Sequence, residues 1–190
     1  VKSGGINLSS NVSGEVYLNG KRYGYVEAEK ELELSQLGSG IYKVEVKSSD
    51  GFVFSKNAEV KTGEKTSVQI QAVKATVQVN NLGKLTINGK DFGEIKNDKT
   101  VFLPNGEYKF SFAIGKQKSK EEKISTTNKS SFEINFKTTK IAVESLIDGR
   151  LYIDGIYYGY VTKNRTFNVD SPLFEGNHNI EVVSEKTRNW

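Results

Sequence analysis

The 190-residue chain has the composition of an ordinary folded protein: 36% of its residues are hydrophobic, 26% are charged, and no apolar stretch approaches the roughly 18 residues of a membrane-spanning helix. It has no cysteine, which excludes disulfides, thiolate nucleophiles and cysteine-ligated zinc, and its single histidine excludes a paired-histidine metal site within one chain. The net charge of +4 comes from the middle third of the chain, so the rest offers no basic stripe for nucleic acid.

A segment with three glycines at fixed spacing occurs three times along the chain, with offsets of 69 and then 66 residues. The three glycine sets are Gly14/Gly20/Gly24, Gly83/Gly89/Gly93 and Gly149/Gly155/Gly159. Such internal periodicity is typical of tandem structural modules. We therefore divide the chain into repeat one (residues 1–73), repeat two (74–138) and repeat three (139–190).

Each glycine segment has the pattern of a β-hairpin. An alternating apolar pair predicts a half-buried strand, and an Asn-Gly or Asp-Gly pair then predicts a type I′ turn. The apolar pairs are Val16/Leu18, Leu85/Ile87 and Leu151/Ile153, and the turn pairs are Asn19-Gly20, Asn88-Gly89 and Asp154-Gly155. The core is expected to include these six apolar residues together with Val44, Phe110 and Ile180.

Further alternating strands with turn residues between them follow every hairpin, and no window has a helical pattern. The fold class is thus predicted to be all-β, with three tandem small immunoglobulin-like β-sandwich modules. Repeat three stops before the two closing strands of the other repeats; we expect that the chain is cut there, the alternative being that another segment completes the sheet. The junctions at residues 71–75 and 137–140 contain no Gly or Pro, which favours a semi-rigid arrangement.

Three features of the chain recur in a known family. They are the segments Leu18–Lys21 and Ile87–Lys90, the glycine four residues after each turn glycine, and the segment Leu103–Phe110. With these features the chain resembles the PEGA repeat, a family of small β-sandwich modules in bacterial and archaeal surface proteins. The same elements are similar to the extracellular repeats of teicoplanin-resistance-associated membrane proteins of Gram-positive bacteria. Both resemblances imply an interaction or spacer role, with no catalytic residue to carry over.

The excess positive charge of repeat two centres on Lys116, Lys118, Lys120 and Lys123, which are expected on an exposed hairpin loop. Four ammonium groups so close together predict weak, salt-sensitive attraction of an anionic cell-wall polymer such as teichoic acid. The alternative is an ordinary solvated loop, since Glu121 and Glu122 interrupt the cluster.

Most aromatic residues fall at core positions of the repeats, but Tyr25, Tyr157 and Tyr160 flank the hairpins and Trp190 lies at the end. Exposed tyrosines can stack on sugar rings or on partner surfaces. Their alternative role is packing against a neighbouring module.

Two other groups of polar residues are candidates for chemistry. His178 stands where the other repeats have Tyr42 and Tyr108, which predicts a partly buried strand residue more readily than a catalytic base. Glu27, Glu29, Glu31 and Glu33 alternate, which predicts a solvated strand edge that discourages strand addition, or alternatively a weak cation site.

We therefore expect a non-catalytic extracellular stalk or interaction segment of a bacterial cell-surface protein, without cofactor or metal. Its expected partners are other surface proteins or an anionic cell-wall polymer. Nucleic acid is not expected, and any membrane attachment would run through segments outside this sequence. The alternative function is a cell-wall polymer or glycan-binding module.

Overall fold

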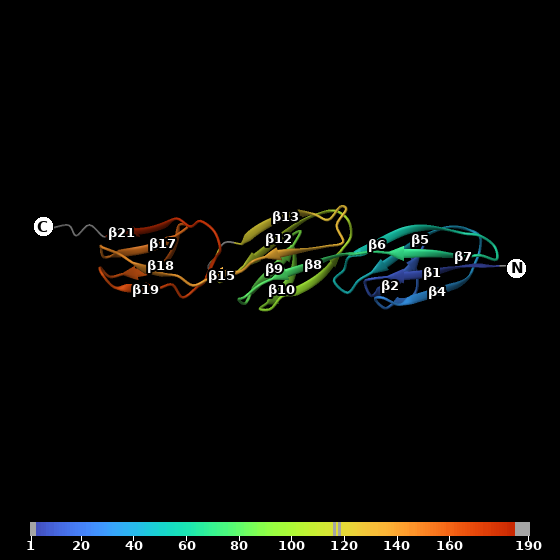
Figure 1. Ribbon diagram of the computed structural model, residues 1–190, viewed down its shortest axis with the longest axis horizontal. Helices are drawn as coiled ribbons and strands as arrows, with labels where there is room; N and C mark the ends of the chain where they lie inside the picture. Colours follow the sequence, from blue (N-terminus) through green and yellow to red (C-terminus); the bar gives the residue numbers. More distant parts are fainter. Residues whose placement is uncertain (1–2, 116, 118, 185–190) are drawn as a thin grey trace. The chain divides into compact units, whose positions relative to one another are not determined.

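The computed structural model describes residues 3–115, 117 and 119–184. Every regular element within these residues is a β-strand, and no helix occurs among them (Figure 1). In particular, this part of the chain holds no helix long and apolar enough to cross a membrane. The prediction of an all-β chain of small immunoglobulin-like sandwiches is confirmed.

The strands are grouped by the repeat to which they belong. Strands β8 and β15 each begin on the last residue that the sequence assigned to the preceding repeat, and each is counted with the repeat that it opens. Repeat one contains β1 (Gly4–Ser10), β2 (Gly14–Leu18), β3 (Lys21–Val26), β4 (Glu31–Leu37), β5 (Gly40–Lys47), β6 (Val53–Val60) and β7 (Lys65–Ile70). Repeat two contains β8 (Val73–Gln78), β9 (Gly83–Ile87), β10 (Lys90–Ile95), β11 (Lys99–Leu103), β12 (Glu107–Ala113), β13 (Lys120–Ser125) and β14 (Ser131–Asn135). Repeat three contains β15 (Thr138–Thr139), β16 (Ala142–Glu144), β17 (Gly149–Ile153), β18 (Ile156–Val161), β19 (Thr166–Asn168), β20 (Leu173–Phe174) and β21 (Ile180–Val183).

The strand order within the sheets recurs from repeat to repeat. Repeat one has the sheets β4-β1-β7 and β3-β2-β5-β6, and repeat two has β11-β8-β14 and β10-β9-β12-β13. Repeat three has the sheet β18-β17-β21 and the short pairs β16-β19 and β15-β20. The described residues of repeat three thus hold counterparts of every strand of repeat one except β6 and β7.

The predicted hairpin turns have the backbone of a type I′ turn, in which both central residues need a positive φ. In repeat one Asn19 has φ 48° and Gly20 has φ 81°. The Asn19 side chain also accepts a hydrogen bond from the Lys43 backbone N–H at 2.8 Å, which ties the turn to β5. The counterparts in the other repeats do the same: Asn88 accepts from the N–H of Lys109, and Asp154 accepts from that of Asn179.

The first glycine of each motif is required by close backbone packing. A Cβ atom at Gly14 would lie 2.4 Å from the Lys47 carbonyl oxygen, and one at Gly149 would lie 2.7 Å from that of Val183. Real Cβ atoms do not approach so closely, so any side chain there would push the neighbouring strand away. The first glycine therefore keeps the strand beside the hairpin in place.

The core of repeat one lies between its two sheets. Ile6 and Leu8 of β1 and Val16 and Val44 of the other sheet all have no exposed surface and belong to one cluster of buried side chains. The sandwich architecture follows from this arrangement, because alternate residues of both sheets fill a common interior.

Eight of the nine predicted core residues are buried, and the prediction for Ile180 is wrong, since 46% of this residue is exposed. Its counterparts Val44 and Phe110 are fully buried. Val44 lies on β5 between β2 and β6, whereas β21 pairs only with β17 among the described strands. A strand with a neighbour on one side leaves its inward side chains less covered, which accounts for the exposure of Ile180.

The chain divides into two compact units that do not follow the repeat boundaries. The first comprises Val1–Thr76, Thr100–Glu107 and Ser125–Phe132, and the second comprises Val77–Lys99, Tyr108–Ile124 and Glu133–Trp190. The boundaries proposed from the repeats, after residues 73 and 138, stay a prediction.

Truncation of Phe110 tests the core of repeat two. This side chain has no exposed surface, so Phe110→Ala should lower the free energy of unfolding by about 3 to 5 kcal/mol, through lost burial and the cavity left behind. Chemical denaturation followed by circular dichroism measures the change. Lys109→Ala, at the exposed neighbouring position on β12, serves as the control and should change little. An unchanged midpoint for Phe110→Ala would mean that the side chain is not part of the core.

Candidate functional site

The predicted tyrosines lie on the edge strands of the hairpin sheets. Tyr25 lies on β3, while Tyr157 and Tyr160 lie on β18, and their exposed fractions are 54%, 47% and 49%. Strand pairing places Tyr157 opposite Tyr152 and Tyr160 opposite Arg150. Two of the three predicted tyrosines therefore share one patch of surface.

This patch covers the outward side of the sheet β18-β17-β21. Leu151 and Ile153 of β17 are buried, so Arg150 and Tyr152, which alternate with them, point outward. Residues directly opposite across strands share a face. We call the resulting set the tyrosine face; its members are Arg150, Tyr152, Tyr157, Tyr160, Glu181 and Val183.

The aromatic rings of the tyrosine face form a shallow corner. The ring centroids of Tyr152 and Tyr157 are 5.6 Å apart, and the planes are inclined at 55°. The hydroxyl groups of Tyr152, Tyr157 and Tyr160 have no hydrogen-bond partner among the described residues. The face thus combines exposed apolar rings with hydroxyl groups that remain available to a ligand.

The corresponding face of repeat one is occupied by its own side chains. The Tyr17 hydroxyl donates to Glu15 at 2.8 Å, the ammonium group of Lys47 lies 4.0 Å from the Tyr17 ring centre, and Arg22 donates to Glu15 at 3.0 Å. The hydrogen bond from Tyr17, followed by that from Arg22, lowers the pKa of Glu15, and the bond to Glu15 raises the pKa of Tyr17. Tyr25 lies opposite Glu15 on this crowded face.

In repeat two the matching face carries no aromatic side chain at the central positions. Lys84 and Thr86 stand where repeat one has Glu15 and Tyr17, and Lys84 forms an ion pair with Asp91 at 2.7 Å. The hydrogen bond to Lys84 is the main cause of the lowered pKa of Asp91. The tyrosine face is therefore particular to repeat three.

The structure describes two of the four predicted lysines, Lys120 and Lys123, and these two do not lie in a loop. Lys116 and Lys118 lie outside the described residues. The prediction of a loop is wrong for Lys120 and Lys123, because β13 already begins at Lys120. Residues of odd separation on a strand point to opposite faces, so these two ammonium groups diverge, and Lys120 is paired with Glu122 at 3.3 Å.

The alternating glutamates do not form one row either, and the prediction of a single strand edge is wrong. Glu27 and Glu29 lie in the turn between β3 and β4, where Glu27 pairs with Lys30 at 2.5 Å. Only Glu31 and Glu33 lie on a strand. In the described part of the chain no group of three or more His, Cys, Asp or Glu side chains is placed to hold a metal ion.

His178 is partly buried, as predicted, but the prediction that it is a strand residue is wrong, because β21 begins at Ile180. Its Nδ1 lies 2.7 Å from a carboxylate oxygen of Asp154, and its Nε2 lies 2.6 Å from the Phe174 carbonyl oxygen. These two hydrogen bonds raise the pKa of His178, the bond to Asp154 contributing most. The imidazole therefore fastens the loop before β21 to the hairpin turn, and its raised pKa means that protonation strengthens this contact.

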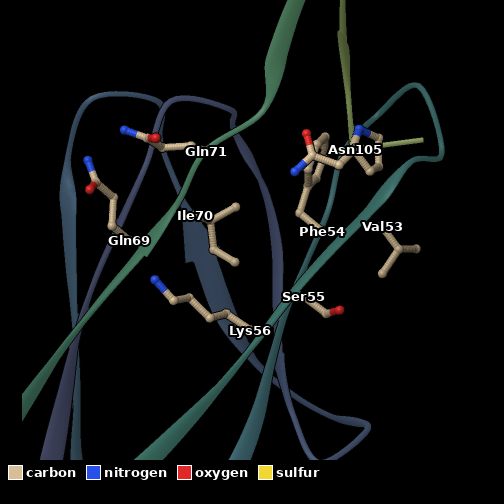
Figure 2. Close-up of a pocket in the computed structure, with 9 residues that line it drawn as sticks. Val53, Phe54, Ser55, Lys56, Gln69, Ile70, Gln71 and Asn105 are labelled. Atoms are coloured by element: carbon tan, nitrogen blue, oxygen red, sulfur yellow. The ribbon is translucent and has the colours of Figure 1, made fainter. Parts of the chain in front are cut away.

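A polar hollow of the surface carries no exposed aromatic ring. This hollow, of ≈ 350 Å³, is bordered by β6, the end of β7 and the loop after β11 (Figure 2). Its amide-bearing residues are Gln69, Gln71 and Asn105, and its ring-bearing residues are the buried Phe54 and the partly buried Pro104. This hollow is thus not a sugar groove lined by aromatic rings, and the predicted tyrosines lie on exposed edge strands instead.

Tyr152 and Arg150 were not singled out from the sequence, although the signal was present. Both alternate with the buried pair Leu151/Ile153, so their outward direction could be read from the strand pattern. Their partners on β18 could not, because a register shift between Leu151 and Tyr152 changes which residues of β18 stand opposite them.

Comparisons with known proteins leave the family open. No protein-family model matches the chain, and no curated protein matches its sequence. The solved structure of the Bacillus anthracis TIE protein is 14% identical with a TM-score of 0.30, over 97% of this chain and 49% of that one. BcpA, the major pilin subunit of Bacillus cereus, is 11% identical with a TM-score of 0.26, over 66% of this chain and 54% of that one.

The chain thus spans about half the length of both of these proteins. TM-scores this low carry no argument about function. The resemblance to PEGA and teicoplanin-resistance repeats likewise stays a prediction.

The His178 pairing predicts a pH-dependent stability of the third repeat. Because its folded pKa is raised, the stabilisation is fully present below the unfolded pKa of about 6.5 and is lost as pH rises through the folded pKa. Denaturant unfolding of the native chain and of His178→Gln between about pH 5.5 and about pH 8.5 measures this, and the difference between them should shrink as pH rises. A difference that stays constant over this range would show that the charge of His178 does not contribute.

Proposed function

We propose that the chain is a non-catalytic structural and interaction segment of an extracellular bacterial surface protein, and that its sandwiches bear tension along the chain. The parallel pairing of the first and last strands of repeat one is the observation that carries this proposal. The repeated architecture also supports a spacer role.

Strands β1 and β7 run side by side in the same direction, in register from Gly5 opposite Lys65 to Ser10 opposite Ile70. The chain therefore enters the repeat at one end of this strand pair and leaves it at the other. A pull on the two ends acts along the strands, so it loads the evenly spaced hydrogen bonds of the parallel ladder together and does not open them one at a time. Such a shear geometry favours slow unfolding under force.

A side-chain clasp secures the exit of the chain from repeat one. Asn11, just after β1, donates to the Ala72 carbonyl oxygen at 2.9 Å and accepts from the Ala72 N–H at 2.8 Å. Both backbone hydrogen-bonding groups of Ala72 are satisfied by one amide, next to the end of β7. The clasp therefore continues the strand pairing to the point where the chain leaves the repeat.

Repeat two contains the same clasp at equivalent positions. Asn80 donates to the Thr138 carbonyl oxygen at 2.8 Å and accepts from the Thr138 N–H at 2.9 Å. Asn11 and Asn80 each stand three residues before the first glycine of the hairpin motif. Within this repeat β8 and β14 are neighbours, which reproduces the pairing of first and last strands.

The hydrogen-bond partners and the arrangement of the titratable side chains support the non-catalytic part of the proposal. The single histidine has both ring nitrogens engaged, by a turn carboxylate and by a backbone carbonyl. Among the described residues, the acidic groups form no metal-binding cluster, and the hollow of Figure 2 holds no Asp, Glu, His or Cys. None of these features provides a nucleophile beside a base in a closed pocket.

The sequence also predicted a second function, in which the lysines of repeat two attract an anionic cell-wall polymer. This function stays a prediction. Its support is weaker than for the spacer role, because Lys120 and Lys123 point to opposite sides of β13 and Lys120 is paired with Glu122. Other surface proteins remain the proposed partners of a spacer.

Removal of the clasp should weaken repeat one. Asn11→Ala leaves the N–H and C=O groups of the nearly buried Ala72 without their partners, which should cost about 1 to 3 kcal/mol in unfolding free energy. Asn11→Asp keeps the hydrogen-bond acceptor and loses the donor. Its unfolding free energy should therefore lie between those of the native chain and Asn11→Ala. Chemical denaturation measures the change, with Asn57→Ala at an exposed position of β6 as the control. Equal stability of Asn11→Ala and Asn57→Ala would contradict a role for the clasp.

The force-bearing role predicts that resistance depends on the direction of pulling. The chain has no cysteine, so pairs of introduced cysteines can serve as unique handles for optical tweezers. Handles at Ser3→Cys and Gln71→Cys pull the β1–β7 pair from opposite ends, whereas handles at Ser3→Cys and Glu64→Cys pull it from the same end. The first geometry should require a clearly higher unfolding force.

The two handle pairs share one attachment point and the same folded repeat, so they differ only in how the ladder is loaded. The thermal midpoints of the two double variants should agree, which confirms that the handles leave the fold intact. Equal unfolding forces in the two geometries would overturn the force-bearing role.

A further inference from the structure

We propose that the tyrosine face of repeat three binds a neutral polysaccharide chain. This inference goes beyond the structural role, since it assigns a binding site and a class of ligand to one repeat. It stands on three features of that face: its exposed rings, its hydroxyl groups that no described residue engages, and its charge balance.

The rings of Tyr157 and Tyr160 are about half exposed, and the Tyr152 ring lies beside that of Tyr157. The C–H face of a sugar ring is apolar and packs on an aromatic ring, while its rim of hydroxyl groups seeks donors and acceptors. Phenol hydroxyl groups can serve as both. Three neighbouring tyrosines whose hydroxyl groups have no partner among the described residues meet both requirements of such a ligand.

Comparison with repeat one shows why the Tyr152 hydroxyl group and ring are not engaged: the residues around them differ between the two repeats. The positions of Glu15 and Lys47, which engage the hydroxyl group and ring of Tyr17, are taken in repeat three by Arg150 and Val183. Val183 cannot form the cation–π contact, and Arg150 cannot accept a hydrogen bond from a phenol. Tyr152, the counterpart of Tyr17, is therefore free of both contacts.

The charge of the face selects among possible ligands. Arg150 and Glu181 contribute one charge of each sign, so the face has no excess that would attract a polyanion. Val183 is its only aliphatic residue, whereas the centre of a stable protein interface is apolar. A neutral glycan fits this combination of aromatic rings, hydroxyl groups and balanced charge better than either alternative.

Affinity electrophoresis of the full chain tests the proposal, in native gels cast with hydroxyethylcellulose or with glycol chitin. The native protein should be retarded in at least one of these gels. The double variant Tyr157→Ala/Tyr160→Ala should lose about tenfold or more in affinity, because it removes two of the three rings. Tyr157→Phe/Tyr160→Phe keeps the rings and removes the hydroxyl groups. Its affinity should lie between those of the native chain and the alanine double variant.

Tyr25→Ala is the matched control, since Tyr25 is the counterpart of Tyr160 on the occupied face of repeat one. It should bind as the native chain does. Circular dichroism melting of all variants checks that they are folded, and the phenylalanine pair provides a readout even where the alanine pair is destabilised.

Three results would overturn the proposal. The first is an absence of retardation in both gels, and the second is equal retardation of the native chain and the alanine pair. The third is a loss of glycan affinity in Tyr25→Ala as large as the loss in Tyr157→Ala/Tyr160→Ala. Concentration-dependent association in sedimentation that the alanine pair abolishes, without any retardation by glycan, would assign the face to a protein partner instead.

Discussion

The hairpin turn of each repeat is the constraint on which the rest of the structure depends. Its Asn or Asp residue adopts a positive φ, and its side chain binds the backbone N–H of a residue at or just before the next strand of the sheet: Asn19 with Lys43, Asn88 with Lys109 and Asp154 with Asn179. One residue thus sets both the reversal of the chain and the register of the third strand. A slip by one residue would turn every inward side chain outward.

Once the register is set, one face of the hairpin sheet packs into the core and the other face contacts solvent. The inward face must fill a common core, so its residues stay apolar in all three repeats. The outward face is free to vary: repeat one carries a network around Glu15 and Tyr17, repeat two an ion pair between Lys84 and Asp91, and repeat three its tyrosines. Differences in function between repeats with one fold can therefore arise on this outward face.

A tension-bearing role and a binding role place their demands on different parts of the repeat. The parallel pairing of β1 with β7 and the Asn11 clasp lie in the sheet that holds the ends of the chain. The tyrosine face belongs to the other type of sheet, the one built on the hairpin. Substitution on one sheet surface can thus change a ligand without loosening the strands that carry the chain in and out.

The sequence by itself determined what depends on residues close together along the chain. Three features are local consequences of turn and strand chemistry. They are the positive φ at Asn-Gly, the burial of alternate residues such as Val16/Leu18, and the outward position of the residues between them. Only the tertiary structure decided what depends on a partner strand. It placed Lys120 and Lys123 on a strand with diverging side chains, left Ile180 exposed on a strand with one neighbour, and brought Tyr152 against Tyr157 through a register shift. Pairing between strands is set by the packing of the whole sandwich, and a pattern of period two along one strand does not contain it.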